Sequence, residues 1–188
     1  SCNIIAREIG ETEITTEDGI EVFQDEKYYL LKKNVKILSD NFTLNAKEVK
    51  IDFDKSLYDI TQLNAKGEVN FVSSKFGMNS KSDFLKFQVK TEKLKVRGMN
   101  SELITKDIKM YSDGFIEINN LNGNFKLEGP NSKLINESIF IKAEKMDGIF
   151  SNIGDQKEIT FLNVIDKKIS YIKNNNTEMY AKKINFDN

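Results

Sequence analysis

The 188-residue chain has no histidine, no tryptophan, one cysteine (Cys2) and one proline (Pro130). Without histidine, it lacks the commonest general base, the commonest zinc ligand and the usual pH switch. Neither a Ser-His-Asp triad nor a Cys-His pair can be built. A single cysteine also excludes an internal disulfide and a multi-cysteine metal cage. We therefore expect no metal site and no cofactor.

An excess of charge of one sign is also lacking, because 28 Lys and Arg residues are balanced by 29 Asp and Glu residues. A net charge of -1 gives no general attraction to nucleic acid or to an anionic membrane, so we expect no nucleic-acid partner. No run of about 18 apolar residues occurs, which excludes a membrane-spanning helix in this sequence. Carboxylates such as Asp52, Asp54 and Glu117 lie in alternating segments, where a solvated strand face explains them. An enzyme with a carboxylate pair is thus the least favoured hypothesis, and we predict a non-enzyme.

The chain begins Ser1-Cys2-Asn3 without a methionine, as a mature form does after loss of a signal peptide. Three interpretations of Cys2 are open: the remnant of a targeting segment or disordered end, the lipid acceptor of a bacterial lipoprotein, or a free thiol. Residues 1–13 are expected to be a flexible segment, and residues 14–188 a single domain.

Apolar and polar residues alternate with period two from residue 14 onward, as in Leu85–Val89, Ile116–Ile118 and Ile139–Ala143. This period is typical of strands with one buried face. Turn signals such as Asp18-Gly19 and Lys66-Gly67 separate the runs. At one strand per 8–12 residues, the sequence predicts an all-β protein with about 15–17 antiparallel strands in one long meander.

A weak repeat links residues 42–53, 139–150 and 179–186, and residues 76–87 fit it with one extra residue. Its form is apolar-x-apolar-x-small-polar-x-apolar, and we expect each unit to form one hairpin. A sheet this large must curl or fold, which places the apolar face inside. The interior is then either a packed sandwich core or an unfilled trough for acyl chains. The candidate groove residues are Leu44, Ala46, Val49, Ile51, Phe53, Met78, Phe87, Val96, Phe125, Ile141, Phe150 and Phe161.

Two free sheet edges are expected, at residues 14–23 and 179–186, and neither segment contains proline. These edges could pair head to tail with another copy, or Lys182 and Lys183 could protect the second one. The candidate pairing residues are Ile20, Val22, Tyr180, Ile184 and Phe186.

The sequence resembles the OstA-like family of periplasmic lipopolysaccharide-transport proteins. The resemblance rests on residues 14–24, Lys33–Ile37, Leu44–Phe53 and Ile60–Val69, and it covers about residues 14–90. Lys47 stands where the family has an acidic residue, and Asn34 replaces a glycine. The resemblance implies an open, twisted, V-shaped antiparallel β-jelly roll whose apolar groove holds the acyl chains of lipid A.

The implied function is a non-catalytic bridge that carries lipopolysaccharide from the inner to the outer membrane of a Gram-negative bacterium, through the periplasm. The implied partners are lipopolysaccharide or its lipid A, inner-membrane LptC-type and outer-membrane LptD-type domains, and further copies in a head-to-tail oligomer. Two alternatives stay open: an LptC-like subunit of the export machinery, and a β scaffold without a ligand.

Overall fold

Alternation along the chain produces a single antiparallel sheet of 16 strands in the computed structural model, which describes residues 9–153 and 156–187. The strands are β1 (Glu13–Thr15), β2 (Ile20–Phe23), β3 (Tyr28–Leu38), β4 (Thr43–Phe53), β5 (Ile60–Ser73), β6 (Met78–Gln88), β7 (Lys93–Arg97), β8 (Ser101–Thr105), β9 (Ile108–Ser112), β10 (Phe115–Asn119), β11 (Asn124–Glu128), β12 (Lys133–Asn136), β13 (Ile139–Lys142), β14 (Lys145–Ile153), β15 (Gln156–Asn174) and β16 (Thr177–Asp187). Within these residues, nothing forms a helix that could cross a membrane. The predicted all-β, open antiparallel jelly roll is confirmed.

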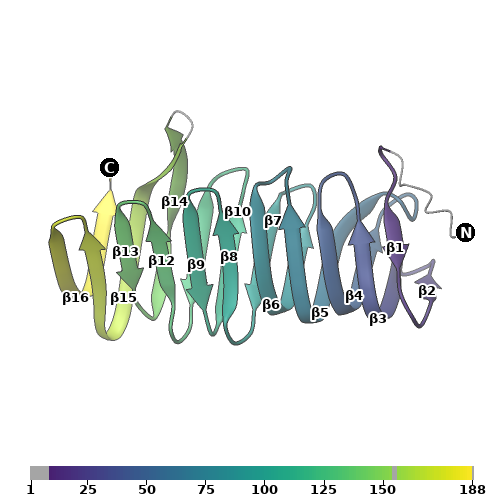
Figure 1. The fold of residues 1–188 in the computed structure, drawn as a ribbon, viewed down its shortest axis with the longest axis horizontal. Coiled ribbons are helices and arrows are strands. Elements are labelled where there is room, and N and C mark those ends of the chain that lie inside the picture. The colour runs from purple at the N-terminus through teal and green to yellow at the C-terminus, as the bar shows by residue number, and fades with distance from the viewer. Residues whose placement is uncertain (1–8, 154–155, 188) are drawn as a thin grey trace, which may run out of the picture.

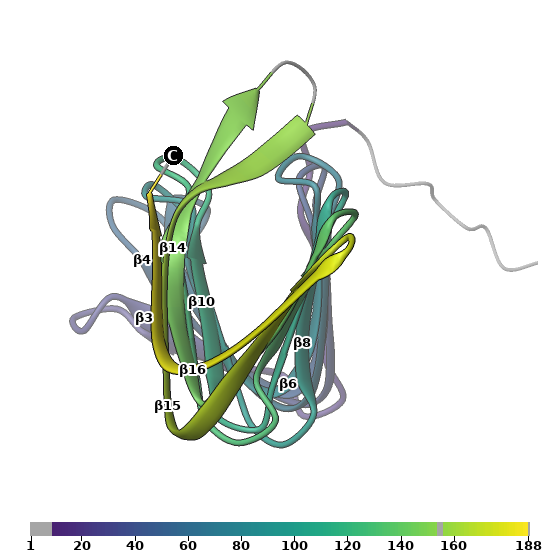
Figure 2. The same ribbon diagram turned by 90° about the vertical axis from the view of Figure 1, so that its left-hand side faces the viewer.

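The sheet folds along its length into two walls that meet at a corner and part on the opposite side (Figure 2). The first wall contains β2, β7, β10, β11 and β14, and the second wall contains β1, β8, β9, β12 and β13. The long strands β3, β4, β5, β6, β15 and β16 turn the corner and belong to both walls. The strands follow one another along the long axis, from the N-terminal to the C-terminal end (Figure 1).

The expected meander is wrong in the middle of the chain. There β7 pairs with β10 and β6, while β8 pairs with β9 and β6. The reason is the short connection through Gly98, which sends the chain across the corner into the other wall instead of back in a hairpin. Gly98 has φ 129°, a backbone conformation that residues other than glycine rarely adopt.

The sequence repeat marks the places where the chain crosses the corner from the second wall to the first. In β4, the inner-face residues Ala46 and Val49 are three apart, so the alternation shifts by one residue there. Ser82 and Leu85 make the same shift in β6. Each unit is therefore one corner crossing, not one hairpin. The residue before the crossing is small because the walls converge at the corner, as with Ala46 and with Ala143 between β13 and β14.

The interior between the walls is filled by the inner-face side chains. Phe71 of the second wall and Phe87 of the first wall have ring centroids 5.5 Å apart, and both side chains are fully buried. Phe76 covers Phe87 from the β5–β6 turn at 5.4 Å. Such contacts join the walls by apolar burial and dispersion.

Replacing Phe87 by alanine should lower the free energy of unfolding by about 3–5 kcal/mol, because a fully buried ring leaves a cavity between the walls. Phe161→Ala is the matched control, since this ring is 37% exposed, and it should cost less than about 1.5 kcal/mol. Urea unfolding followed by fluorescence or circular dichroism measures both. Equal losses would contradict the packed interior.

Candidate functional site

The structure places eleven of the twelve candidate groove residues on the inner faces of the walls. Their exposed fractions run from 0 to 7%. They are Leu44, Ala46, Val49, Ile51, Phe53, Met78, Phe87, Val96, Phe125, Ile141 and Phe150. At this burial they form a packed core, which is the first of the two interiors that the sequence left open. A lipid contact of these residues remains a prediction.

Phe161 is the exception, and its expected inward orientation is wrong. Ile149 pairs with Phe161, but the next residue, Phe150, pairs with Ile159. Thr160 is thus an extra residue in β15, and such a bulge moves the following side chains to the opposite face. Phe161 is 37% exposed on the outer face, whereas Ile159 and Leu162 point inward.

Inner-face apolar side chains become accessible at the N-terminal end of the molecule. Ile20 and Val22 pair with the buried Leu31 and Tyr29, which fixes their direction toward the interior. No further strand covers them within the described residues, so they remain 52% and 48% exposed. They line a cavity of about 950 Å³ together with Ile14, Tyr29, Leu57, Tyr58, Ile60 and residues 10–13. We call this cavity the N-terminal mouth.

A loop from β4 to β5 overhangs the N-terminal mouth. The Tyr29 hydroxyl donates a hydrogen bond to the Leu57 carbonyl oxygen at 3.3 Å. Burial, with a smaller contribution from Tyr58, raises the pKa of Tyr29 to about 12. The phenol therefore stays neutral at physiological pH and holds the loop over the cavity as a hydrogen-bond donor.

The C-terminal end is open in the same way. Met179, Ile184 and Phe186 of β16 pair with the buried residues Ile172, Val164 and Leu162, so they face the interior. Met179 is 42% exposed and Phe186 is 44% exposed. Tyr180 lies on the same edge strand but points outward, where its ring lies 5.0 Å from that of Tyr171.

A second cavity, of about 930 Å³, lies between the rims of the walls in the C-terminal half. Ile135, Ile139, Ile159 and Phe186 give it an apolar part, and Lys106, Asp107, Lys109, Glu137, Lys157 and Glu158 give it a charged part. One polar contact crosses between the rims here, from the Lys157 backbone N–H to the Asp107 carboxylate at 3.3 Å. A molecule with both apolar and charged parts would suit this lining.

The two sheet edges differ in form. At the C-terminal edge, β16 runs continuously over both walls and pairs with β15 alone. At the N-terminal edge, the chain leaves the sheet between β1 and β2, and both strands pair with β3. All five candidate pairing residues lie on these edge strands.

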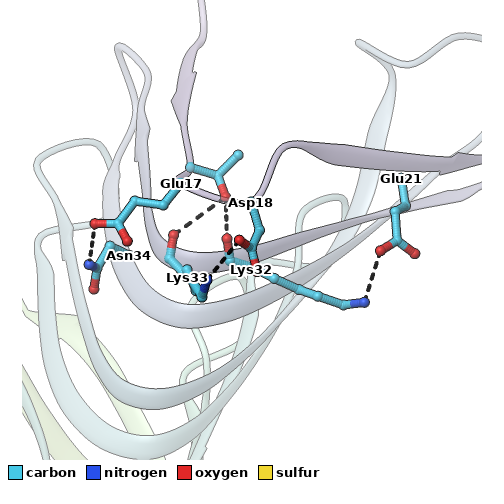
Figure 3. A network of polar contacts seen from close by, with 7 residues as sticks. Glu17, Asp18, Glu21, Lys32, Lys33 and Asn34 are labelled. Carbon is cyan, nitrogen blue, oxygen red and sulfur yellow. Dashed lines mark hydrogen bonds and ion pairs between the residues drawn. The ribbon is translucent and has the colours of Figure 1, made fainter.

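A polar network fixes the gap between β1 and β2 against the corner of β3 (Figure 3). Lys33 forms an ion pair with Asp18 at 2.9 Å, and the Asn34 amide donates to Glu17 at 2.6 Å. The Glu17 N–H donates to the Lys33 carbonyl oxygen at 3.0 Å. The hydrogen bond from Lys33 to Asp18 raises the pKa of the ammonium.

The described part of the chain contains no metal-binding geometry. No group of three or more Cys, Asp or Glu residues there could hold a metal ion. Cys2 and most of the predicted flexible segment lie outside the described residues, so those expectations remain predictions. The boundary of the predicted domain at residue 14 likewise remains a prediction.

Several residues of the open ends were not among the candidate site residues. Ile14 and Met179 lie in the predicted edge segments, and Tyr29 and Ile60 follow the alternation, so all four carry a signal in the sequence. Leu57 and Tyr58 lie in a loop, where alternation carries no signal.

No protein-family model matches the chain, and no curated protein sequence matches it. Among solved structures, the chain is similar to LptH from Pseudomonas aeruginosa, the LptA-homologous periplasmic component of the lipopolysaccharide transport device. The TM-score is 0.50 at 9% sequence identity, and the match covers 59% of this chain and 77% of LptH. At this identity the likeness concerns the fold alone.

The raised pKa of Tyr29 predicts a pH dependence of stability. Between pH 10 and 12, the unfolded chain loses the phenol proton before the folded chain does, so the folded state loses stability as the pH rises. The contribution is complete below about pH 10 and vanishes above about pH 12.

Denaturant unfolding at several pH values should therefore show a shallower decline for Tyr29→Phe than for the native chain. Tyr58→Phe is the comparison: Tyr58 is 90% exposed and makes only the smaller contribution to the raised pKa of Tyr29, so this variant should change the slope less than Tyr29→Phe does. An unchanged slope in Tyr29→Phe would show that Tyr29 is not the source of the pH dependence.

Proposed function

We propose that this protein is a non-catalytic lipid-binding module of the lipopolysaccharide-transport type, whose open ends receive acyl chains. The observation that carries the proposal is the exposure of inner-face apolar residues at both ends, above all Ile20 and Val22 in the N-terminal mouth. The two-walled fold, which is also that of LptH, supports it. Periplasmic localisation belongs to the same proposal.

The mouth is suitable in size and chemistry for an acyl chain. Its volume of about 950 Å³ lies at the upper end of ordinary ligand sites. Each buried CH₂ group gains about 0.8 kcal/mol, so a chain of about 12 carbons gains on the order of 10 kcal/mol before ordering costs. No titratable group is needed for this gain, which agrees with a chain that contains no histidine.

Carriage along the whole interior requires the walls to part. Opposite the corner, the walls meet mainly through apolar side chains such as Phe71 and Phe87. Contacts of this kind are not directional, so a hydrocarbon chain can replace them with little loss. As a lipid moves inward from the mouth, apolar contacts between the walls would thus be replaced by apolar contacts with its acyl chain.

The free edges provide the proposed route between modules. β16 of one copy would pair with β1 and β2 of the next, which extends both walls and joins the C-terminal opening of one copy to the N-terminal mouth of the other. Inner-membrane LptC-type and outer-membrane LptD-type domains are the proposed partners at the two ends of such a series. An LptC-like role has the same geometry and is the nearest alternative.

A second candidate function is a β scaffold without a ligand. The fully buried side chains of the middle strands favour it, because they leave no space for a guest in this conformation. The binding experiment below separates the two functions.

The double variant Ile20→Asp/Val22→Asp should weaken binding of purified lipid A by at least about tenfold, because charge in the mouth opposes burial of an acyl chain. Ile149→Asp/Ile165→Asp is the matched control, since these residues are 37% and 38% exposed on the outer face. Native mass spectrometry and displacement of a fluorescent fatty acid measure binding. A native chain that binds no acylated molecule, or equal effects in both variants, would favour the scaffold.

Edge pairing predicts disulfide-linked oligomers from one cysteine at each edge. In a Cys2→Ser background, Val22→Cys/Ile184→Cys should give a ladder of covalent oligomers on mild oxidation. The control pair Ile104→Cys/Ile149→Cys lies on outer faces and should remain monomeric. Denaturing gel electrophoresis without reductant shows the outcome, and identical patterns would exclude pairing through the edges.

A further inference from the structure

The outer face of the first wall gathers five cationic side chains from four neighbouring strands. They are Lys50 of β4, Lys66 of β5, Lys86 of β6, and Lys95 and Arg97 of β7. We call them the outer basic patch. They surround a shallow depression of about 330 Å³, whose lining includes one carboxylate, that of Glu48.

The pairing register sets like charges against each other in this patch. Lys86 and Lys95 are directly opposite each other in β6 and β7. In the adjacent row, Lys66 lies between Glu48 of β4 and Phe84 of β6, and Phe84 pairs with Arg97, so Arg97 has no carboxylate directly opposite it in β6. Like charges directly opposite each other destabilise a sheet, so the fold carries a local electrostatic cost that an anion would relieve.

Other lysines on this face are neutralised by carboxylates. Lys93 lies 2.9 Å from Glu117, and Lys126 lies 3.4 Å from Glu128. Within the patch, Lys50 pairs with Asp52 at 3.0 Å, and Lys95 shares Glu117 at 3.7 Å. Among the described residues, Lys66, Lys86 and Arg97 form no ion pair with a carboxylate, although Glu48 lies opposite Lys66 in the sheet. Three cations are therefore available to an external anion.

The shape of the patch favours an extended, flat partner. Neighbouring strands lie about 4.8 Å apart, and alternate residues along a strand about 6.8 Å apart, so the cations form an array and not a single pocket. Backbone N–H groups here belong to the sheet ladder and cannot form an anion-binding nest. Phe84 could stack on a nucleobase, but Arg97 already covers its ring at 4.6 Å.

We infer that the outer basic patch docks the first wall on a lipid bilayer surface that carries anionic phosphate headgroups. Charge complementarity supports this partner, since exposed Lys and Arg side chains are attracted to anionic lipids within a Debye length. The inference goes beyond the proposed function and needs no acyl chain in the interior. It also gives the two walls different roles, because the outer face of the first wall then faces the membrane.

Co-sedimentation with vesicles tests the inference. The native chain should bind vesicles of phosphatidylcholine with about 30% phosphatidylglycerol, and binding should fall as NaCl rises and be absent with phosphatidylcholine alone. Lys86→Gln/Arg97→Gln should lower the partition coefficient on the order of tenfold. Lys36→Gln/Lys142→Gln is the control, since both lysines are exposed on the second wall, and it should stay within about twofold of the native value.

The charge-preserving variant Lys86→Arg should bind like the native chain. Equal losses in the two double variants would show that overall charge acts and not the patch, which would overturn the inference. Failure to bind anionic vesicles, or tighter binding to a single-stranded oligonucleotide, would also overturn it. Binding of the fluorescent fatty acid, which has no phosphate group, should remain native in the patch variant, so this result and that for the N-terminal mouth can be told apart.

Discussion

Everything in this fold depends on the corner, because two walls share one interior only if each strand keeps its apolar residues inside after it turns. A strand with strict alternation would keep its direction and leave the corner unpacked. β4 solves this by a shift of one residue between Ala46 and Val49, opposite two left-handed residues, Lys33 and Asn34, in β3. The weak sequence repeat reflects this requirement, since a small residue followed by a charged one recurs where each repeat unit crosses from the second wall to the first.

Inner and outer faces could largely be predicted from the sequence because burial and alternation are both local. The exceptions arise at a bulge and at a connection between strands, which alternation does not reveal. Phe161 follows an extra residue, Thr160, and alternation cannot show where a bulge falls. The order of β7 to β15 in the sheet could not be predicted either. Arg97-Gly98 has the sequence of a hairpin turn, but in the structure this connection takes the chain across the corner into the other wall.

The outer basic patch could not be predicted from the composition of the chain. Lys50 and Arg97 are 47 positions apart in the sequence, and the net charge of -1 gives no sign that they share a surface. Their proximity depends on the registers in which β4 to β7 pair. Composition describes the average surface, whereas binding depends on the local excess of one charge.

Coverage by neighbouring strands explains both the packed middle of the molecule and its open ends. Inner-face residues are covered wherever a neighbouring strand exists, and they are exposed at β2 and β16 because the sheet ends there. Exposed apolar residues at an end are unfavourable when the protein is alone in water, because their apolar surface stays in contact with the solvent. A second module or an acyl chain would remove that cost at the same position, so edge pairing and lipid entry would act on the same residues. The ends are therefore the part of the molecule where stability and the proposed function meet.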